Sequence, residues 1–199
     1  PLRLVGSEMC IRDSFYTTHL NEEPIKGIKK MKQTDNFKFD EANVMNELVY
    51  RNLSEDAKRQ ICAWKYGGEY DLYNLPAYEE MQVRQIGFMN PKSEKNYYGF
   101  WDESILVGFV NILEEKEEVF IGIGVNPDLC NKHYGQRMLL ITYEISKKLY
   151  PDKPLYLEVR TWNIRAVKCY QKAGFRIDGQ AYELTTGIGT GTFYRMIRE

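Results

Sequence analysis

The chain has 199 residues, and its 27 Lys and Arg residues nearly balance 28 Asp and Glu residues, which leaves a formal net charge of −1. That length suits one domain with an ample core, and the mixed charges argue against a nucleic-acid-binding surface. We therefore expect no nucleic acid as a partner. We also expect no membrane partner, because no apolar run approaches the length of a membrane-spanning helix.

The cysteines argue against a metal site. Cys10, Cys62, Cys130 and Cys169 are scattered without CxxC spacing, and only two histidines accompany them. A structural zinc site needs closely spaced Cys and His ligands, so we expect no metal. Free thiols suit a reducing compartment, and we therefore expect a cytoplasmic location.

Residues 1–44 are expected to form an extension outside the domain, which we place at residues 45–199. Residues 1–14 resemble translated adapter or assembly-junction sequence, because they lack an initiator methionine and a signal-peptide core. The polar, Lys-rich stretch that follows predicts disorder or a short loose helix. Met45 is a plausible native start, and Met31 is the alternative.

The first half of the domain reads as alternating short elements. We expect a strand over 47–53 and then a helix to Ile61, capped by Ser54 with acidic residues in its first turn. An aromatic segment over 64–76 contains too many glycines for one regular helix, and a helix is expected over 78–86. Strands over 97–101 and 105–113 are predicted to pair across a polar turn.

The run VFIGIGV over 119–125 predicts a buried strand, which Asn126-Pro127-Asp128 ends. Its interior Gly122 and Gly124 indicate either a close backbone approach or a packing accommodation. The loop over 130–136 leads into an amphipathic helix. A loop at a helix N-terminus presents unpaired N–H groups and a positive dipole, which suits a pyrophosphate.

Three polar groups occupy fixed positions in the run over 155–175. Alternation predicts a strand that carries Glu158, Asn163 can cap the following helix, and Tyr170 falls about two turns into that helix. Gly174 ends it. Two last strands are expected over 176–185 and 192–198, around a glycine-rich turn at 187–191. The sequence shows no internal repeat and no second domain.

This run, LEVR…N…A…Y…GF, resembles the C-terminal half of the GNAT family of N-acetyltransferases, and most of all the ribosomal-protein N-terminal alanine acetyltransferases. The resemblance implies that Glu158 is the general base, that Asn163 contacts the pantetheine arm and that Tyr170 protonates the leaving thiolate. Some relatives place the base on the preceding strand, where Glu118 stands, so that alternative remains open. Without the family, Glu158 could be a solvated strand residue and Tyr170 a core aromatic.

The loop over 130–136 resembles the pyrophosphate loop of that family, Gln/Arg-x-x-Gly-x-Gly/Ala. Gly135 occupies the second glycine position, whereas His133 replaces the first glycine and Cys130 replaces Gln or Arg. Histidine tolerates positive φ better than most residues but adds bulk, so we expect weaker CoA binding and not its loss. The resemblance assigns cofactor binding to Ile123, Gly124, Val125, Asn131, Lys132, His133, Tyr134, Gly135, Gln136 and Asn163.

In this family the first helices and their loop form one wall of the acceptor site. That makes Trp64, Tyr66, Tyr70 and Tyr73 candidates for substrate binding, although such aromatics can equally complete a core. The fold implied is an α/β (α+β) GNAT fold: a mixed central sheet of about seven strands, helices on both faces and a splayed cofactor cleft.

The implied activity is transfer of an acetyl group from acetyl-CoA to a primary amine by direct attack, without a metal. The amine would belong to a protein N-terminus or a small molecule, and the protein would be a monomer or a homodimer. A non-catalytic acyl-CoA-binding or regulatory module on the same fold is the alternative, since fold does not fix function. A dinucleotide-binding enzyme is excluded, because no GxGxxG follows the first strand.

Overall fold

The computed structural model describes residues 48–199, so the predicted N-terminal extension and the choice of starting methionine lie outside the described residues. One mixed sheet carries eight strands in the order β1-β2-β3-β4-β5-β8-β6, and β7 also pairs with β8. The strands are β1 (Val49–Asn52), β2 (Tyr97–Asp102), β3 (Ile105–Glu114), β4 (Val119–Val125), β5 (Leu155–Arg160), β6 (Arg176–Ile177), β7 (Tyr182–Thr186) and β8 (Gly189–Arg198).

The described part also contains four α-helices: α1 (Glu55–Ala63), α2 (Tyr78–Arg84), α3 (Tyr134–Leu149) and α4 (Ile164–Lys172). The predicted N-cap of α1 is confirmed, because the Ser54 hydroxyl accepts a hydrogen bond of 3.3 Å from the Ala57 N–H. Helix α2 ends earlier than predicted, where Gln85 adopts left-handed backbone angles. The aromatic segment contains the short 3₁₀ helix η1 (Gly68–Tyr73).

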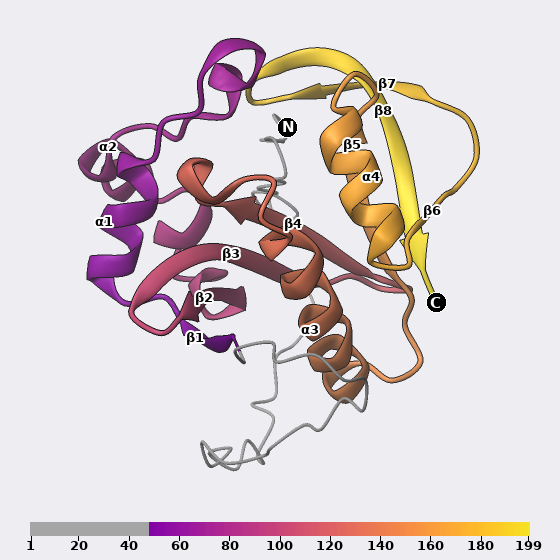
Figure 1. Ribbon diagram of the computed structural model, residues 1–199, viewed down its shortest axis with the longest axis horizontal. Coiled ribbons are helices and arrows are strands. Elements are labelled where there is room, and N and C mark those ends of the chain that lie inside the picture. Colours follow the sequence, from indigo (N-terminus) through magenta and orange to yellow (C-terminus); the bar gives the residue numbers. More distant parts are fainter. Residues whose placement is uncertain (1–47) are drawn as a thin grey trace.

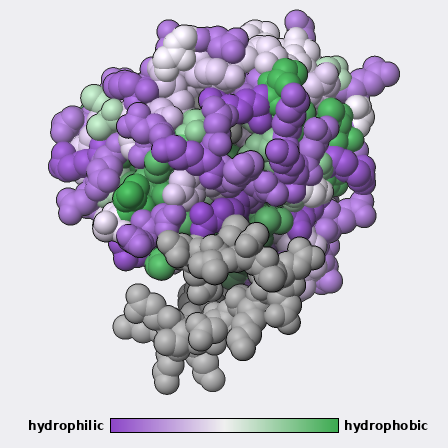
Figure 2. All heavy atoms as spheres, viewed as in Figure 1, coloured by the Kyte–Doolittle hydropathy of each residue, from purple (hydrophilic) through white to green (hydrophobic). Residues whose placement is uncertain are grey.

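Helices cover both faces of the sheet (Figure 1). Phe109 of β3 packs in a cluster with residues of α1 and α2. The next residue, Val110, packs instead in a cluster with residues of α3 and α4. Because successive strand residues point to opposite faces, the two helix pairs lie on opposite sides of the sheet. Figure 2 shows that hydrophilic residues cover most of the visible surface, with hydrophobic residues in small separate groups.

Strands β4 and β5 are parallel but pair at only two positions, Val119 with Leu155 and Phe120 with Tyr156. Beyond Phe120 the register ends, although both strands continue for several residues. The splayed strands and the mixed α/β sheet confirm the predicted fold class. Within residues 48–199, no helix has the length and apolar character needed to cross a membrane.

The C-terminal strands differ from the prediction. The stretch over 176–185 divides into β6 and β7, and Gly179 between them has a positive φ. The turn between β7 and β8 is shorter than predicted, so Gly189 and Gly191 belong to β8. Gly191 leaves room for a neighbouring side chain there: a Cβ would lie 1.9 Å from Nη1 of Arg160, so the guanidinium would have to move.

Candidate active site

Beyond Phe120, β4 no longer pairs with β5, and this part of the strand, 121–125, is called its open end. The open end directs backbone groups toward β5. The Asn126 N–H donates to the Val107 carbonyl within β3, whereas the Val119 N–H donates to the Pro154 carbonyl just before β5. Alternate residues of a strand direct their N–H and C=O groups to opposite edges. Ile123 and Val125 therefore direct theirs toward β5, at positions where the pairing between β4 and β5 has ended.

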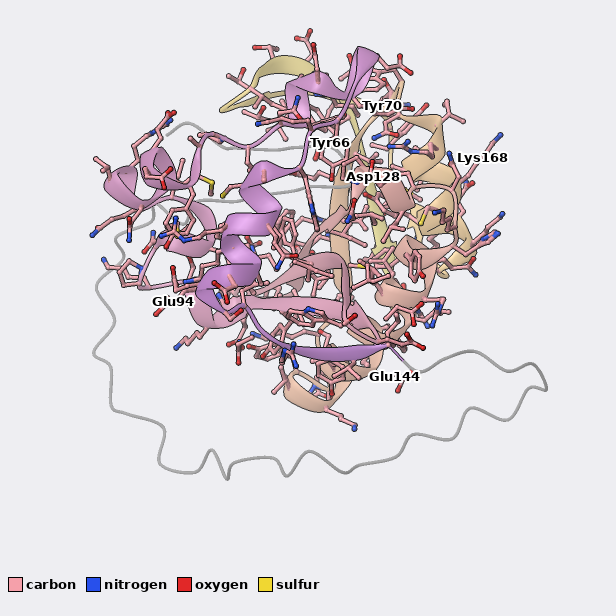
Figure 3. All side chains as sticks on the ribbon, turned by 60° about the vertical axis from the view of Figure 1, so that its left-hand side comes forward. Tyr66, Tyr70, Glu94, Asp128, Glu144 and Lys168 are labelled. Atoms are coloured by element: carbon pink, nitrogen blue, oxygen red, sulfur yellow. The ribbon has the colours of Figure 1, made fainter. Side chains whose placement is uncertain are left out.

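Tyr66 reaches this open end from the loop after α1. Its hydroxyl donates a 2.7 Å hydrogen bond to the Val125 carbonyl, and its backbone is held by two hydrogen bonds with the side chain of Asn74. Figure 3 shows Tyr66 and Tyr70 at the same end of the molecule as Asp128, in the loop that follows β4. Trp64, by contrast, stacks on Phe109 and packs against the α1/α2 core.

Tyr70 and Tyr73 lie against the loop between β5 and α4. Both rings contact Trp162, with ring centroids 5.6 Å and 5.7 Å away, and the guanidinium of Arg165 lies 4.2 Å from the centre of the Tyr70 ring. Sequence reasoning missed Trp162. The available signal was a tryptophan next to the capping Asn163, in a loop that joins two functional elements.

Glu158 is buried on the face of β5 opposite α4. Its strand neighbours Leu157 and Val159 pack in the α3/α4 core, so Glu158 points to the other face. The side chain is 6% exposed, and its Oε1 accepts a 2.7 Å hydrogen bond from the Tyr182 hydroxyl. Tyr182 begins β7, outside the run that carries the family resemblance, and sequence reasoning missed it.

Glu118, the alternative base, has a different environment. It precedes β4 at the end where β4 and β5 still pair, and its carboxylate accepts hydrogen bonds from both terminal nitrogens of Arg195. The Nε of Arg195 also donates to Asp178 at 3.1 Å. Glu118 is therefore part of a charged network at the closed end of the strand pair.

Asn163 occupies the junction between β5 and α4, as predicted. Its Oδ1 accepts a 3.1 Å hydrogen bond from the Ala166 N–H and so caps α4. The residue is fully buried, and its Nδ2 has no hydrogen-bond partner within residues 48–199. A buried amide donor that the protein leaves unsatisfied is costly, which makes this nitrogen a candidate ligand-binding group.

Tyr170 lies on α4 and is buried in the α3/α4 core, where its ring packs near Phe175. The structure therefore places Glu158 and Tyr170 on opposite faces of the sheet.

The loop before α3 matches the expected backbone. His133 has φ +64° and Asn131 has φ +63°, so His133 adopts the left-handed conformation that a glycine provides in the family pattern. The side chain of His133 does not cap the helix, and the first helical bond runs from the Arg137 N–H to the His133 carbonyl. The first N–H groups of α3 consequently have no partner within the helix.

Several side chains of this loop turn away from that N-terminus. The Tyr134 hydroxyl donates to Asp102 at 2.7 Å, and this hydrogen bond raises the pKa of Tyr134. Arg137 lies 3.9 Å from the same carboxylate, and Gln136 donates to the Lys172 carbonyl. Lys132 is exposed. Backbone N–H groups are therefore the main donors that this loop can offer to an anion.

Gly135 allows α3 and α4 to approach closely, because a Cβ there would lie 3.0 Å from the Cys169 sulfur. The described residues contain no group of His, Cys, Asp and Glu side chains that could hold a metal ion.

A family model described as the acetyltransferase (GNAT) family matches residues 59–175. The chain belongs to this family. The match includes 123–125, 131–136 and Asn163, which are the predicted cofactor-binding residues. Comparison with curated proteins finds no match.

Solved structures of other GNAT proteins share the fold. A GNAT acetyltransferase from Bacillus anthracis is 17% identical with a TM-score of 0.63, and the alignment covers 76% of this chain and 93% of that one. Spermidine N-acetyltransferase from Vibrio cholerae, solved with CoA and spermine, is also 17% identical with a TM-score of 0.62, over 76% and 94% of the two chains. At these identities the likeness concerns the fold alone.

Proposed function

We propose that this GNAT protein transfers an acetyl group from acetyl-CoA to a primary amine by direct attack of the amine. The observation that carries the proposal is the buried Nδ2 of Asn163, an unsatisfied donor beside the open end of the strand pair. A donor in that position suits an amide carbonyl of a pantetheine arm.

The remaining contacts for acetyl-CoA would come from two backbone segments. The N–H and C=O groups of Ile123 and the N–H group of Val125 face the side on which β5 has diverged, and they can pair with an extended ligand as a further strand would. The Val125 carbonyl already accepts a hydrogen bond from the Tyr66 hydroxyl. The open N-terminus of α3 suits the pyrophosphate. Because β4 and β5 are parallel, their C-terminal ends and the two helices that follow meet at the same edge of the sheet.

Glu158 is the residue that we propose as the base. An aliphatic primary amine is largely protonated at neutral pH and must lose a proton before it attacks. Glu158 can accept that proton directly or through a water. Its position beside the open end supports it over Glu118, whose carboxylate is paired with Arg195 at the closed end.

Two further groups would assist the transfer. A backbone N–H at Ile123 or Val125 would stabilise the negative charge that develops on the thioester oxygen. The Tyr170 hydroxyl would donate a proton to the departing CoA sulfur from the α4 side of the sheet. The placement of Glu158 and Tyr170 on opposite faces of the sheet supports separate roles for them, Glu158 as base and Tyr170 as proton donor.

For the acceptor we propose either a protein N-terminus, as in the ribosomal-protein alanine acetyltransferases, or a small-molecule amine. In the aromatic cluster of Tyr70, Tyr73 and Trp162, Tyr73 is buried, whereas Tyr70 and Trp162 keep exposed surface. That surface supports an acceptor with an apolar or cationic group beside the amine. We propose a cytoplasmic location from the cysteine pattern, and a monomer or a homodimer as the assembly.

The test combines ligand binding with acetyl transfer in the full chain. Thermal unfolding is measured with CoA and with acetyl-CoA, and thiol release is measured with spermidine, a peptide with an N-terminal alanine, a lysine peptide and an aromatic amine. We expect a raised melting temperature and thiol release with at least one amine. Binding without release favours the non-catalytic module, and no shift at saturating ligand contradicts both functions.

A further inference from the structure

We infer that Tyr182 is a positioning residue for Glu158, an inference that rests on the proposed function. The Tyr182 hydroxyl donates to Oε1 of Glu158 at 2.7 Å, across 24 residues of sequence. This contact fixes one oxygen of a side chain that is 6% exposed. A base has to present its carboxylate to the amine in a defined orientation, and a fixed rotation about the last side-chain bond provides it.

The element that carries Tyr182 is itself well held. Strand β7 pairs with β8 over five residue pairs, from Tyr182 with Phe193 to Thr186 with Gly189. The Tyr182 ring packs against the small cluster of Phe120, Tyr156 and Phe193 on the Glu158 face of the sheet. The hydroxyl is therefore presented by a packed strand and not by a free loop, which is the arrangement that keeps a catalytic group in place.

Arg160 ties the same hairpin to β5. It lies two residues beyond Glu158, and its guanidinium donates to the carbonyls of Gly189 and Thr190 at 3.3 Å and 3.4 Å. The absence of a side chain at Gly191 leaves room for that guanidinium. Strand β8 also pairs directly with β5, so side-chain contacts from Tyr182 and Arg160 add to a backbone connection between the hairpin and the strand that carries the base.

A second tyrosine–glutamate pair provides a matched control. The Tyr156 hydroxyl donates to Oε2 of Glu115 at 2.8 Å, and Tyr156 lies on the same face of β5 as Glu158. Tyr156 pairs with Phe120 at the closed end, however, and Glu115 follows β3. Tyr156→Phe removes a similar hydrogen bond without touching the proposed base, so it reports the structural part of the effect.

The experiment compares Tyr182→Phe with Tyr156→Phe in the full chain, using the amine identified in the transfer assay. We expect Tyr182→Phe to lower kcat about tenfold, because the carboxylate loses its fixed orientation. The KM for acetyl-CoA should change by less than about twofold, because the hydrogen bond involves the proposed base and none of the groups proposed to bind acetyl-CoA. Tyr156→Phe should leave both constants within about twofold of the parent values.

A double-mutant cycle separates positioning from a general structural effect. If Tyr182 acts through Glu158, Tyr182→Phe has no further effect on the residual rate of Glu158→Ala, because there is no carboxylate to orient. An equal fractional loss in both backgrounds overturns the inference, as does an unchanged kcat in the single variant. If the unmodified chain acetylates no amine, the proposed function fails and the role of Tyr182 fails with it.

Discussion

The two ends of β4 share the neighbour β3 but differ in their contact with β5. At its start, β4 pairs with β5, and the preceding Glu118 is bound by Arg195. At its other end, β5 has diverged, and the backbone of Ile123 and Val125 faces the space between the strands. One short parallel pairing thus fixes the relative direction of the strands, while their divergence leaves backbone groups available to a ligand.

The two glutamates considered as the base, Glu118 and Glu158, also have different environments. The Glu118 side chain is 25% exposed and shares Arg195 with Asp178. Glu158 is buried and receives a tyrosine hydroxyl. The Glu118 carboxylate is thus bound by a guanidinium, whereas the Glu158 carboxylate accepts from a neutral hydroxyl.

The largest expected effect is a loss of turnover when the proposed base beside the open end of β4 is changed. Glu158→Gln should lower kcat by about 10²–10⁴-fold, because an amide cannot accept the proton of the amine. Its residual rate should rise more steeply with pH than that of the parent, since only amine that is already neutral can react. Initial rates from pH 6 to 9, with the responsive amine, measure both.

Glu118→Gln is the comparison at the closed end. It should retain kcat within about threefold and instead lower the free energy of unfolding by about 1–3 kcal/mol, because Arg195 loses a charged partner. A loss of turnover in Glu118→Gln with near-normal turnover in Glu158→Gln would reverse the assignment of the base.

Gly124→Ala tests why the open end contains glycine. A Cβ at this position would lie 2.6 Å from the ring of Phe109, so the ring has to move. We expect a loss of about 1–3 kcal/mol in the free energy of unfolding, measured with a chemical denaturant. Gly67→Ala, where a Cβ meets nothing within 4 Å, is the control. Unchanged stability with weakened CoA binding would assign Gly124 to cofactor approach instead of packing.

Asn163→Ser separates helix capping from ligand binding. Serine keeps an oxygen that can cap α4 but removes the buried Nδ2 donor. Loss of one hydrogen bond of about 0.5–1.5 kcal/mol corresponds to a dissociation constant for CoA about 2- to 12-fold higher. Titration calorimetry measures the dissociation constant for CoA in each variant. Asn163→Ala should show the same weakening and a lower melting temperature, whereas equal affinity in Asn163→Ser would remove the proposed contact.

The smallest expected effect concerns His133 in the loop before α3. His133→Gly keeps the positive φ and removes the imidazole, so CoA binding should tighten by about two- to threefold, less than 1 kcal/mol. His133→Ala removes the bulk but keeps the strained backbone of a non-glycine residue. If neither variant binds CoA more tightly, the histidine does not limit access to the phosphate site.

Local signals in the sequence determined most of the elements and the backbone of the site. Ser54 and Asn163 cap the predicted helices, and alternation placed Glu158 on a strand, because caps and alternation depend on residues only a few positions apart. The resemblance to the family's pyrophosphate loop placed His133 at a glycine position, and His133 has the positive φ that such a position allows. The family resemblance added the splayed strands, which the pairing of β4 and β5 confirms.

Only the tertiary structure decided which distant side chains meet at the site. The contacts of Tyr66 with Val125 and of Tyr182 with Glu158 join residues 59 and 24 positions apart. Glu118 meets Arg195 across 77 residues, a contact that no local pattern in the sequence indicates. Such contacts depend on how packed elements approach one another, and no local propensity encodes that distance.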